Sequence, residues 1–306
     1  MARISPSSSA QKKIDLFTWH LKNHEDLNVK TINEYDSDLR NLAFWFEGSW
    51  QEHQEKETPF APEEITTPTL IHYREYMQLI RKLKPATINR RLLTCKRYFE
   101  WTLDQGITKS NPAKPLKLIP EIKSPPRWIT DKEEADLVTA VEKNGSLRDQ
   151  TIIILMLHTG IREMEVCDLT PGDISIGKKS GTLIVRAGKR SKYREVPLNI
   201  TIRTMLETYL SSLNEETEYL FVSGKTKGRL SERGLRYVIK KYVDKAGLEN
   251  IRAHDLRHRF GYVMAKRTPI HRLAQIMGHN SLDTTAIYIQ ATHQDLQEEV
   301  EKIAWQ

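Results

Sequence analysis

Residues 158–165 read HTGIREME, and residues 254–258 read HDLRH. The first stretch directly follows the apolar run Ile152–Leu157, which predicts a buried helix that breaks at the Thr-Gly pair. The second stretch opens another predicted helix, and its first histidine and its arginine, three residues apart, share one face of that helix. Each stretch therefore puts an arginine near a helix boundary and beside other polar side chains.

The spacing of apolar residues around these stretches predicts a mainly α-helical chain with one small β element. Residues 1–110 predict an N-terminal bundle of about four helices. Residues 111–127 are rich in proline, which cannot sustain a helix, and predict an extended linker. Residues 128–306 predict a second, mixed α/β domain. A chain of 306 residues is long enough for two domains with separate cores.

The elements of the second domain follow from local patterns. Thr130 and Glu133 have the spacing of a capping box and predict a helix over 131–143. Strands at 182–186 and 193–198 flank a basic turn and predict a hairpin. The remaining segments with helical periodicity are 148–158, 162–168, 200–213, 231–246, 254–267, 270–277, 283–290 and 293–304.

The composition excludes several classes of protein. An apolar share of 39% is ordinary for a globular protein and excludes a collagen-like or wholly disordered chain. No apolar run approaches the roughly 20 residues that a membrane span needs, and residues 1–10 lack the apolar region of a secretory signal. The two cysteines, Cys95 and Cys167, fit a reducing compartment. We therefore expect a cytoplasmic protein without membrane contact.

The charge is basic and unevenly distributed. Lys and Arg number 47 against 40 Asp and Glu, a net charge of +7 that alone is weak evidence for a polyanionic partner. Three segments, 81–97, 178–194 and 252–272, are rich in basic residues and hold at most one acid each. One such segment also suits a solvated helix face. Three of them in both domains favour a nucleic-acid surface that the domains share.

Five polar segments follow one another along the chain in this order: HTGIREME, Gly188-Lys189-Arg190, HDLRH, Met277-Gly278-His279 and Tyr288. Lys189 lies 27 residues after Arg162, and Tyr288 lies nine residues after His279. This pattern closely resembles the tyrosine recombinases, the phage-integrase family, which show T-G-x-R-x-x-E, a hairpin lysine, H-x-L-R-H, a G-H pair and a tyrosine. The resemblance covers residues 150–290. It implies an N-terminal core-binding domain and a C-terminal catalytic domain that clamp DNA.

The two arginines also have a chemical reason of their own. A phosphodiester is cut in line when its non-bridging oxygens are held and its leaving oxygen receives a proton. The planar guanidiniums of Arg162 and Arg257 match phosphate geometry and stay charged, so they can hold those oxygens without a metal. Loss of one such donor lowers a rate by on the order of 10²–10³.

The resemblance implies roles for the other residues. Tyr288 would be the nucleophile and form a 3′-phosphotyrosine bond, which conserves the bond energy so that rejoining needs no ATP. His254 would be the general base and acid, Lys189 would protonate the 5′-hydroxyl, and His279 would donate a hydrogen bond to the phosphate. Glu165, one helical turn after the first arginine, would orient that arginine or the general base.

Each of these residues has an ordinary structural interpretation when taken alone. Arg162 suits an ion pair with the nearby glutamate, Lys189 a solvated hairpin tip, and His254 a helix cap. Tyr288 suits a place in the core, and His279 a packing or capping role. Five such coincidences in one order and spacing are improbable, so the set together favours an active site.

The candidate DNA contacts are basic residues outside the catalytic set: Arg90, Arg91 and Lys96 on a predicted helix, and Arg190, Lys192 and Arg259 near the catalytic positions. Exchange of strands between two duplexes needs four active sites, so the resemblance implies a synaptic homotetramer on double-stranded DNA. The terminal segment 293–304 has an apolar stripe. It suits docking on the chain's own core or, as the resemblance favours, in a neighbouring protomer to close a ring.

No H-E-x-x-H motif, P-loop or G-x-G-x-x-G motif occurs, so we expect no cofactor, neither a metal nor ATP. The function expected is site-specific recombination that integrates, excises or resolves a mobile element or replicon. One alternative is a type IB topoisomerase, which shares the chemistry but relaxes supercoils as a monomer. Another is a non-catalytic DNA-binding protein that keeps the fold.

Overall fold

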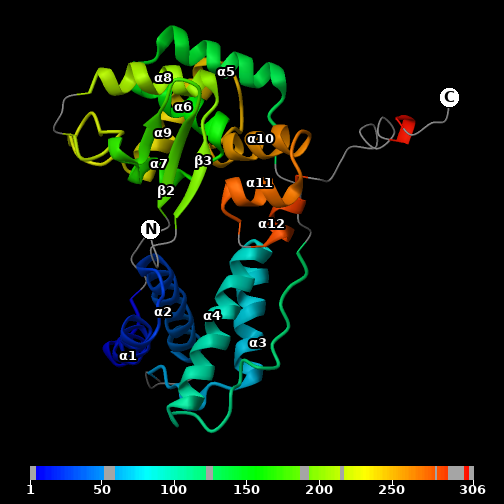
Figure 1. Ribbon diagram of the computed structural model, residues 1–306. Coiled ribbons are helices and arrows are strands. Elements are labelled where there is room, and N and C mark those ends of the chain that lie inside the picture. The colour runs from blue at the N-terminus through cyan, green and yellow to red at the C-terminus, as the bar shows by residue number, and fades with distance from the viewer. Residues whose placement is uncertain are drawn as a thin grey trace. The chain divides into compact units, whose positions relative to one another are not determined.

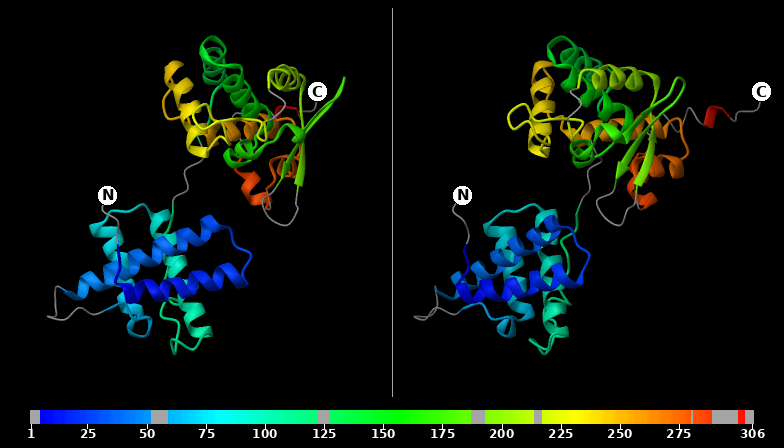
Figure 2. Two further views of the ribbon diagram at one scale, coloured as in Figure 1. Left: turned by 90° about the vertical axis from the view of Figure 1, so that its left-hand side faces the viewer. Right: turned by 60° about the vertical axis from the view of Figure 1, so that its left-hand side comes forward.

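The computed structural model describes residues 5–51, 59–121, 127–186, 193–213, 217–279, 281–288 and 300–302. The chain divides into two compact units, Met1–Lys123 and Ser124–Gln306 (Figure 1, Figure 2). Each unit has a buried apolar core of its own.

The described part of the N-terminal unit contains four α-helices, in agreement with its apolar periodicity: α1 (Ser8–His24), α2 (Val29–Gln51), α3 (Thr67–Glu75) and α4 (Pro85–Asp104). A proline occupies the first turn of α3 and of α4, where its missing N–H would have no helical partner. Helix α3 continues into a π-helical turn, Tyr76–Ile80. The apolar faces of these helices meet in one core, in which the Phe17 ring packs edge-on against Tyr98.

The proline-rich segment does not begin as a free linker at residue 111, which corrects the predicted boundary. Ala113 is buried in the helical core, and the side chain of Asn89 bonds both the N–H and the carbonyl of Ile119, each at 2.8 Å. Residues 111–121 form turns and extended chain without a helix, as their proline content predicts. Composition alone placed the start of the linker too early, because it does not register these contacts.

Helix α6 (Leu147–Thr159) lies at the centre of the C-terminal unit. Every residue of its apolar run Ile152–Leu157 is buried, because α5 (Asp131–Asn144), α8 (Ile200–Ser211) and α10 (Ala253–Ala265) all pack against it (Figure 1). The other α-helices described in this unit are α7 (Glu163–Asp168), α9 (Glu232–Lys245), α11 (Ile270–Met277) and α12 (Leu282–Ala286).

The sheet of this unit has three antiparallel strands in the order β1 (Ile174–Ile176), β2 (Gly181–Arg186) and β3 (Tyr193–Pro197). The β2–β3 hairpin is confirmed, with Leu183 paired to Val196. The sequence did not predict β1, which is too short to display an alternating pattern. Figure 2 shows the strands at one flank of the unit. The hairpin turn, residues 187–192, lies outside the described residues.

Most helix boundaries agree with the predictions to within a few residues. The capping box is confirmed: the Glu133 N–H donates to Thr130 Oγ1 (3.2 Å), and the Thr130 N–H donates to Glu133 Oε2 (2.9 Å). Helix α12 ends earlier than predicted, at Ala286. Of the predicted terminal helix 293–304, only residues 300–302 are described.

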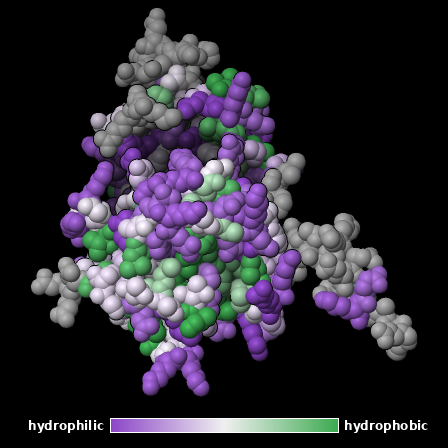
Figure 3. Space-filling model, turned by 90° about the horizontal axis from the view of Figure 1, so that it is seen from above, coloured by the Kyte–Doolittle hydropathy of each residue, from purple (hydrophilic) through white to green (hydrophobic). Residues whose placement is uncertain are grey.

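Hydrophilic side chains dominate the face of the molecule that Figure 3 shows, and hydrophobic side chains are scattered among them. A mean hydropathy of −0.56 agrees with this view. None of the helices in the described ranges has both the length and the apolar character needed to cross a membrane.

Candidate active site

Arg162 lies where α6 gives way to α7. Gly160 ends α6 with a φ of 61°, and a Cβ there would lie 2.3 Å from Cδ1 of Phe260, so only glycine fits this turn. The backbone N–H of Arg162 donates to Glu165 Oε2 (2.7 Å). Its guanidinium donates to Glu165 Oε1 (2.9 Å) and to the carbonyl of Gly278 (2.8 Å). Because the side chain is still 42% exposed, the guanidinium remains accessible to an anion.

Glu165 also contacts Arg194, which lies on β3. Its terminal nitrogens donate to the two carboxylate oxygens (2.8 Å each), and its Nε donates to the carbonyl of Ile276 (2.9 Å). Burial acts to raise the pKa of Glu165, but the hydrogen bonds and charges of Arg194 and Arg162 outweigh it and lower that pKa to about 2. Glu165 is therefore an anion at neutral pH, shared between two guanidiniums.

Arg194 is a residue that the sequence prediction missed. It shares a face of β3 with Val196, which is buried, so strand alternation points Arg194 inward. An arginine on an inward face needs a carboxylate partner. The sequence holds that signal, but the basic residues of this region were assigned only to DNA contacts, catalysis by Lys189 or a solvated hairpin tip.

Arg257 is buried in the second turn of α10, with 2% exposure. Its guanidinium donates to the carbonyls of Gly160 and Met277, the latter at 2.8 Å, and contacts His279 Nε2 at 2.8 Å. Burial and then the charge of Arg162 lower the pKa of Arg257 to about 10, so it is still a cation at neutral pH.

Arg162 and Arg257 meet at one short segment of backbone. They donate to consecutive carbonyls, those of Gly278 and Met277. Gly278 ends α11 with a φ of 66°, and a Cβ there would lie 2.8 Å from a terminal nitrogen of Arg194. The structure thus brings the two predicted phosphate-binding arginines together at the predicted Met-Gly-His segment.

His279 is engaged at both ring nitrogens. Because the arginine can only donate, His279 Nε2 accepts from Arg257, and Nδ1 then carries the hydrogen and faces Thr285 Oγ1 at 2.7 Å. Burial, followed by the charges of Arg257 and Arg162, lowers the pKa of His279 to about 4, so the ring is neutral at neutral pH. To donate a hydrogen bond to a phosphate from Nε2, His279 would have to release Arg257 and carry its hydrogen on Nε2 instead of Nδ1.

Tyr288 packs against His279 beside the two arginines and is 6% exposed. Its hydroxyl is 3.0 Å from Nδ1 of His258, and its ring is nearly parallel to that of His279, with centroids 6.3 Å apart. Burial raises its pKa to about 12, against the opposing effect of the charges of Arg257 and Arg162. The phenol is therefore protonated at neutral pH and lies within the field of both guanidiniums.

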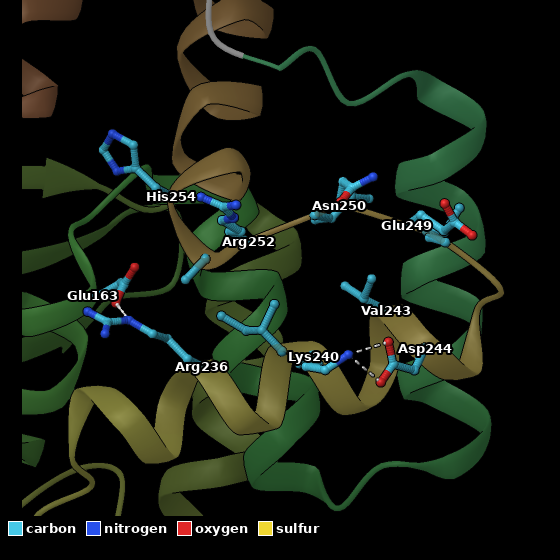
Figure 4. Close-up of a pocket in the computed structure, with 13 residues that line it drawn as sticks. Glu163, Arg236, Lys240, Val243, Asp244, Glu249, Asn250, Arg252 and His254 are labelled. Atoms are coloured by element: carbon cyan, nitrogen blue, oxygen red, sulfur yellow. Dashed lines mark hydrogen bonds and ion pairs between the residues drawn. The ribbon is translucent and has the colours of Figure 1, made fainter. Parts of the chain in front are cut away.

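His254 lies one turn before His258 on the same face of α10, and the two rings meet edge-on with centroids 4.3 Å apart. Partial burial and then the charge of Arg257 lower the pKa of His254. The ring borders a cavity of about 650 Å³ (Figure 4). In that cavity Arg236 of α9 pairs with Glu163, the residue after Arg162. His254 thus borders this cavity and contacts His258.

The expected DNA contact of Arg259 is not supported. Its guanidinium is 8% exposed, pairs with Asp131 and Glu134, and donates to the carbonyl of Ile129 (3.1 Å). These bonds join α10 to the start of α5 and occupy the donors that a phosphate would need. A count of basic residues missed this because the acidic partners lie far away in the sequence.

The N-terminal candidates lie on α4. Arg90, 43% exposed, donates to the buried carboxylate of Asp38 (2.7 Å), and Arg91 lies 3.7 Å from the other oxygen. Burial raises the pKa of Asp38 despite these two charges. Lys96 donates to the carbonyl of Lys114 (3.2 Å). The remaining candidates, Lys189, Arg190 and Lys192, lie outside the described residues.

Within the described ranges, no group of three or more His, Cys, Asp or Glu side chains is arranged to hold a metal ion. His254 and His258 do have the four-residue spacing of a pair of metal ligands on a helix. His258, however, contacts the hydroxyl of Tyr288, which is not one of these metal-ligand types.

Comparison with known proteins identifies relatives of this arrangement. A model described as the phage integrase family matches residues 127–295. The tyrosine recombinase XerA of Pyrococcus horikoshii is 33% identical over 250 residues, which cover 78% of this chain and 82% of that protein.

Solved structures share the fold at lower identity. The XerH site-specific recombinase bound to its difH substrate has a TM-score of 0.72 at 20% identity, covering 96% of this chain and 85% of that one. A lambda integrase tetramer bound to a Holliday junction has a TM-score of 0.69 at 17% identity, covering 90% of this chain and 76% of that one.

Proposed function

Because the chain belongs to the phage integrase family, we propose that it is a tyrosine-type site-specific DNA recombinase that cleaves and rejoins strands through a 3′-phosphotyrosine bond. One observation carries the proposal: Arg162 and Arg257 bind consecutive carbonyls of one turn, and the charges of both guanidiniums act on Tyr288. This cluster offers positive charge for a phosphate and a hydroxyl as nucleophile. The reaction integrates, excises or resolves a mobile element or replicon, in the cytoplasm where such DNA lies.

In the proposed cleavage step the two guanidiniums hold the non-bridging oxygens of the scissile phosphate. The Tyr288 hydroxyl loses its proton, its oxygen bonds to phosphorus, and the bond from phosphorus to the 5′-oxygen breaks. Charge stabilisation by fixed donors is the largest contribution to such a reaction. Arg162 is exposed enough to reach the phosphate, whereas the buried Arg257 gains a free donor for it when His279 Nε2 leaves.

The proton steps are assigned to the remaining residues. His254 is the proposed general base and acid, since its lowered pKa leaves the ring neutral and able to accept a proton at neutral pH. Lys189 is the proposed donor to the 5′-oxygen. His279 is the proposed donor to the phosphate, after its Nε2 leaves Arg257 and takes up the ring hydrogen. Glu165 keeps Arg162 in place.

Neither a metal nor ATP enters this scheme. Rejoining reverses cleavage: a 5′-hydroxyl attacks the phosphotyrosine bond, the phenol recovers its proton, and the energy of the original bond is conserved.

Assembly is the second part of the proposal. We propose a homotetramer on two duplexes, with the segment 293–304 of one protomer docked on the next. A cavity of about 460 Å³ between α6, α10, α11 and the end of β3 suits an apolar helix face. Its apolar lining includes Leu157, Pro197, Phe260, Met264 and Ile276. Arg90, Arg91 and Lys96 on one unit, and Arg190 and Lys192 on the other, remain the proposed contacts to DNA.

The test is a covalent trapping experiment. Duplexes that the protein binds are selected from randomised DNA, and a nick beside the cleavage position lets the short product strand diffuse away. We expect a protein–DNA adduct with the wild type and none with Tyr288→Phe. Tyr209→Phe, which removes a hydroxyl that donates to the Leu220 carbonyl, is the matched control and should form the adduct. An adduct that persists in Tyr288→Phe would contradict the proposed nucleophile.

A further inference from the structure

His258 has no role in the scheme above, although its side chain meets the hydroxyl of the nucleophile. Its Nδ1 lies 3.0 Å from the Tyr288 hydroxyl, and both side chains are buried. A buried hydroxyl needs a hydrogen-bond partner, and His258 provides one, on the same helix as Arg257.

The chemistry of the pair fixes the direction of this hydrogen bond. Burial, and then the charges of His254 and Arg257, lower the pKa of His258 to about 4, so the ring is neutral at neutral pH. The phenol, with a pKa of about 12, keeps its proton. The hydroxyl of Tyr288 therefore donates to Nδ1 of His258, which fixes the rotation of the O–H bond and leaves an oxygen lone pair directed elsewhere.

The helix that carries His258 also positions the tyrosine ring. Gly261, three residues on, has no side chain, and a Cβ there would lie 2.6 Å from Cζ of Tyr288. Tyr262, one residue later, packs edge-on against the ring with centroids 5.2 Å apart. One face of α10 thus contacts the hydroxyl, the ring face and the ring edge of Tyr288.

We propose that His258 is the positioning residue of the nucleophile, and that its hydrogen bond holds the Tyr288 hydroxyl in line with a phosphate bound by Arg162 and Arg257. This inference rests on the proposed function, because it presumes that Tyr288 attacks DNA. It gives His258 a task different from that of His254: His258 accepts the hydrogen bond that orients the oxygen before attack, and His254 takes the proton once the O–H bond turns away from His258. Small misplacements of a nucleophile have large effects on rate.

Two variants separate the hydrogen bond from the space that the ring fills. His258→Asn keeps an acceptor near the place of Nδ1, whereas His258→Leu fills similar space without one. His271→Asn, on the exposed side of α11, is the control for a histidine outside the pocket.

Two reactions are measured in single turnover. The first is adduct formation on the nicked duplex, which needs Tyr288. The second is the joining of a strand bearing a 3′-(p-nitrophenyl phosphate) to a 5′-hydroxyl, with release of p-nitrophenol. The second reaction uses the arginines without the phenol, so Tyr288→Phe should still perform it.

We expect His258→Leu to form the adduct roughly 10- to 100-fold more slowly while joining stays near the wild-type rate, and His258→Asn to recover most of the loss. The inference is overturned if His258→Leu forms the adduct at the wild-type rate or faster, if His258→Asn is as slow as His258→Leu, or if both reactions fall together. Absence of any adduct with the wild type would instead refute the proposed function.

Discussion

Replacing Glu165 with glutamine keeps the shape of its side chain and removes the charge that Arg162 and Arg194 share. The pKa of this carboxyl falls from 4.5 to about 2 in the folded protein. At 1.36 kcal/mol per pKa unit, this shift corresponds to about 3 kcal/mol of stability for the C-terminal unit. The side chain is only 10% exposed, so screening by solvent does not greatly reduce that value.

The pH dependence has a definite sign. Because folding lowers the pKa of Glu165, the stabilisation is fully present above pH 4.5 and is lost as the pH falls towards 2. Glu165→Gln lacks it at every pH. The two proteins should therefore differ most at neutral pH, and the gap should narrow between pH 4.5 and 2.

Hydrogen exchange of the α6 amides measures this difference, because a helix buried on all sides opens only with its whole unit. The matched control is Glu163→Gln, two residues away, whose partner Arg236 is 58% exposed. An exposed pair of this kind contributes about 0–1 kcal/mol, so the control should remain near the wild type. Equal protection of wild type and Glu165→Gln at pH 7, or a gap that persists unchanged at pH 2, would refute the reasoning.

Three further variants test separate contacts. Arg194→Met should slow adduct formation by roughly 10-fold or more, and Arg194→Lys should not restore it, because one ammonium cannot bridge both oxygens of the glutamate; a wild-type rate with Lys would contradict this. Gly261→Ala should slow cleavage by displacing the nucleophile's ring, whereas Gly228→Ala, with no atom within 4 Å of the added carbon, should behave as wild type; equal rates would show that the ring adapts. Arg259→Met should lower the free energy of unfolding of the C-terminal unit by about 1–3 kcal/mol, because the two carboxylates lose their partner. The salt dependence of DNA affinity should stay unchanged. A shallower salt dependence would show that Arg259 contacts DNA.

The sequence predicts those helices and strands that are determined by residues close to one another in the chain. Helix α6 follows from an apolar run with a glycine at its end, and α5 follows from the reciprocal hydrogen bonds of Thr130 and Glu133. The β2–β3 hairpin follows from alternation on both sides of a polar turn. Strand β1 has only three residues, fewer than one alternating pattern needs, and owes its existence to pairing with β2.

The site was predictable as a set of residues but not as a set of contacts. Arg162 and Arg257 are held by main-chain carbonyls, and a carbonyl has no signature in a sequence, since every residue has one. His258 was visible only as part of HDLRH, because nothing local indicates that it meets a tyrosine 30 residues away. The ion pairs of Arg259 with α5 span 125 and 128 residues, so its sequence neighbours give no sign of them.

The most direct test of the proposed nucleophile is to identify the residue that becomes bonded to DNA. After trapping on the nicked duplex, nuclease and trypsin leave a nucleotide on one peptide, and mass spectrometry locates it. The tryptic peptide Leu273–Lys302 contains a single tyrosine, Tyr288, so fragmentation can assign the added mass without ambiguity. We predict a nucleotide joined through its 3′-phosphate to the Tyr288 oxygen. Its presence on any other residue, with Tyr288 unmodified, would contradict this prediction.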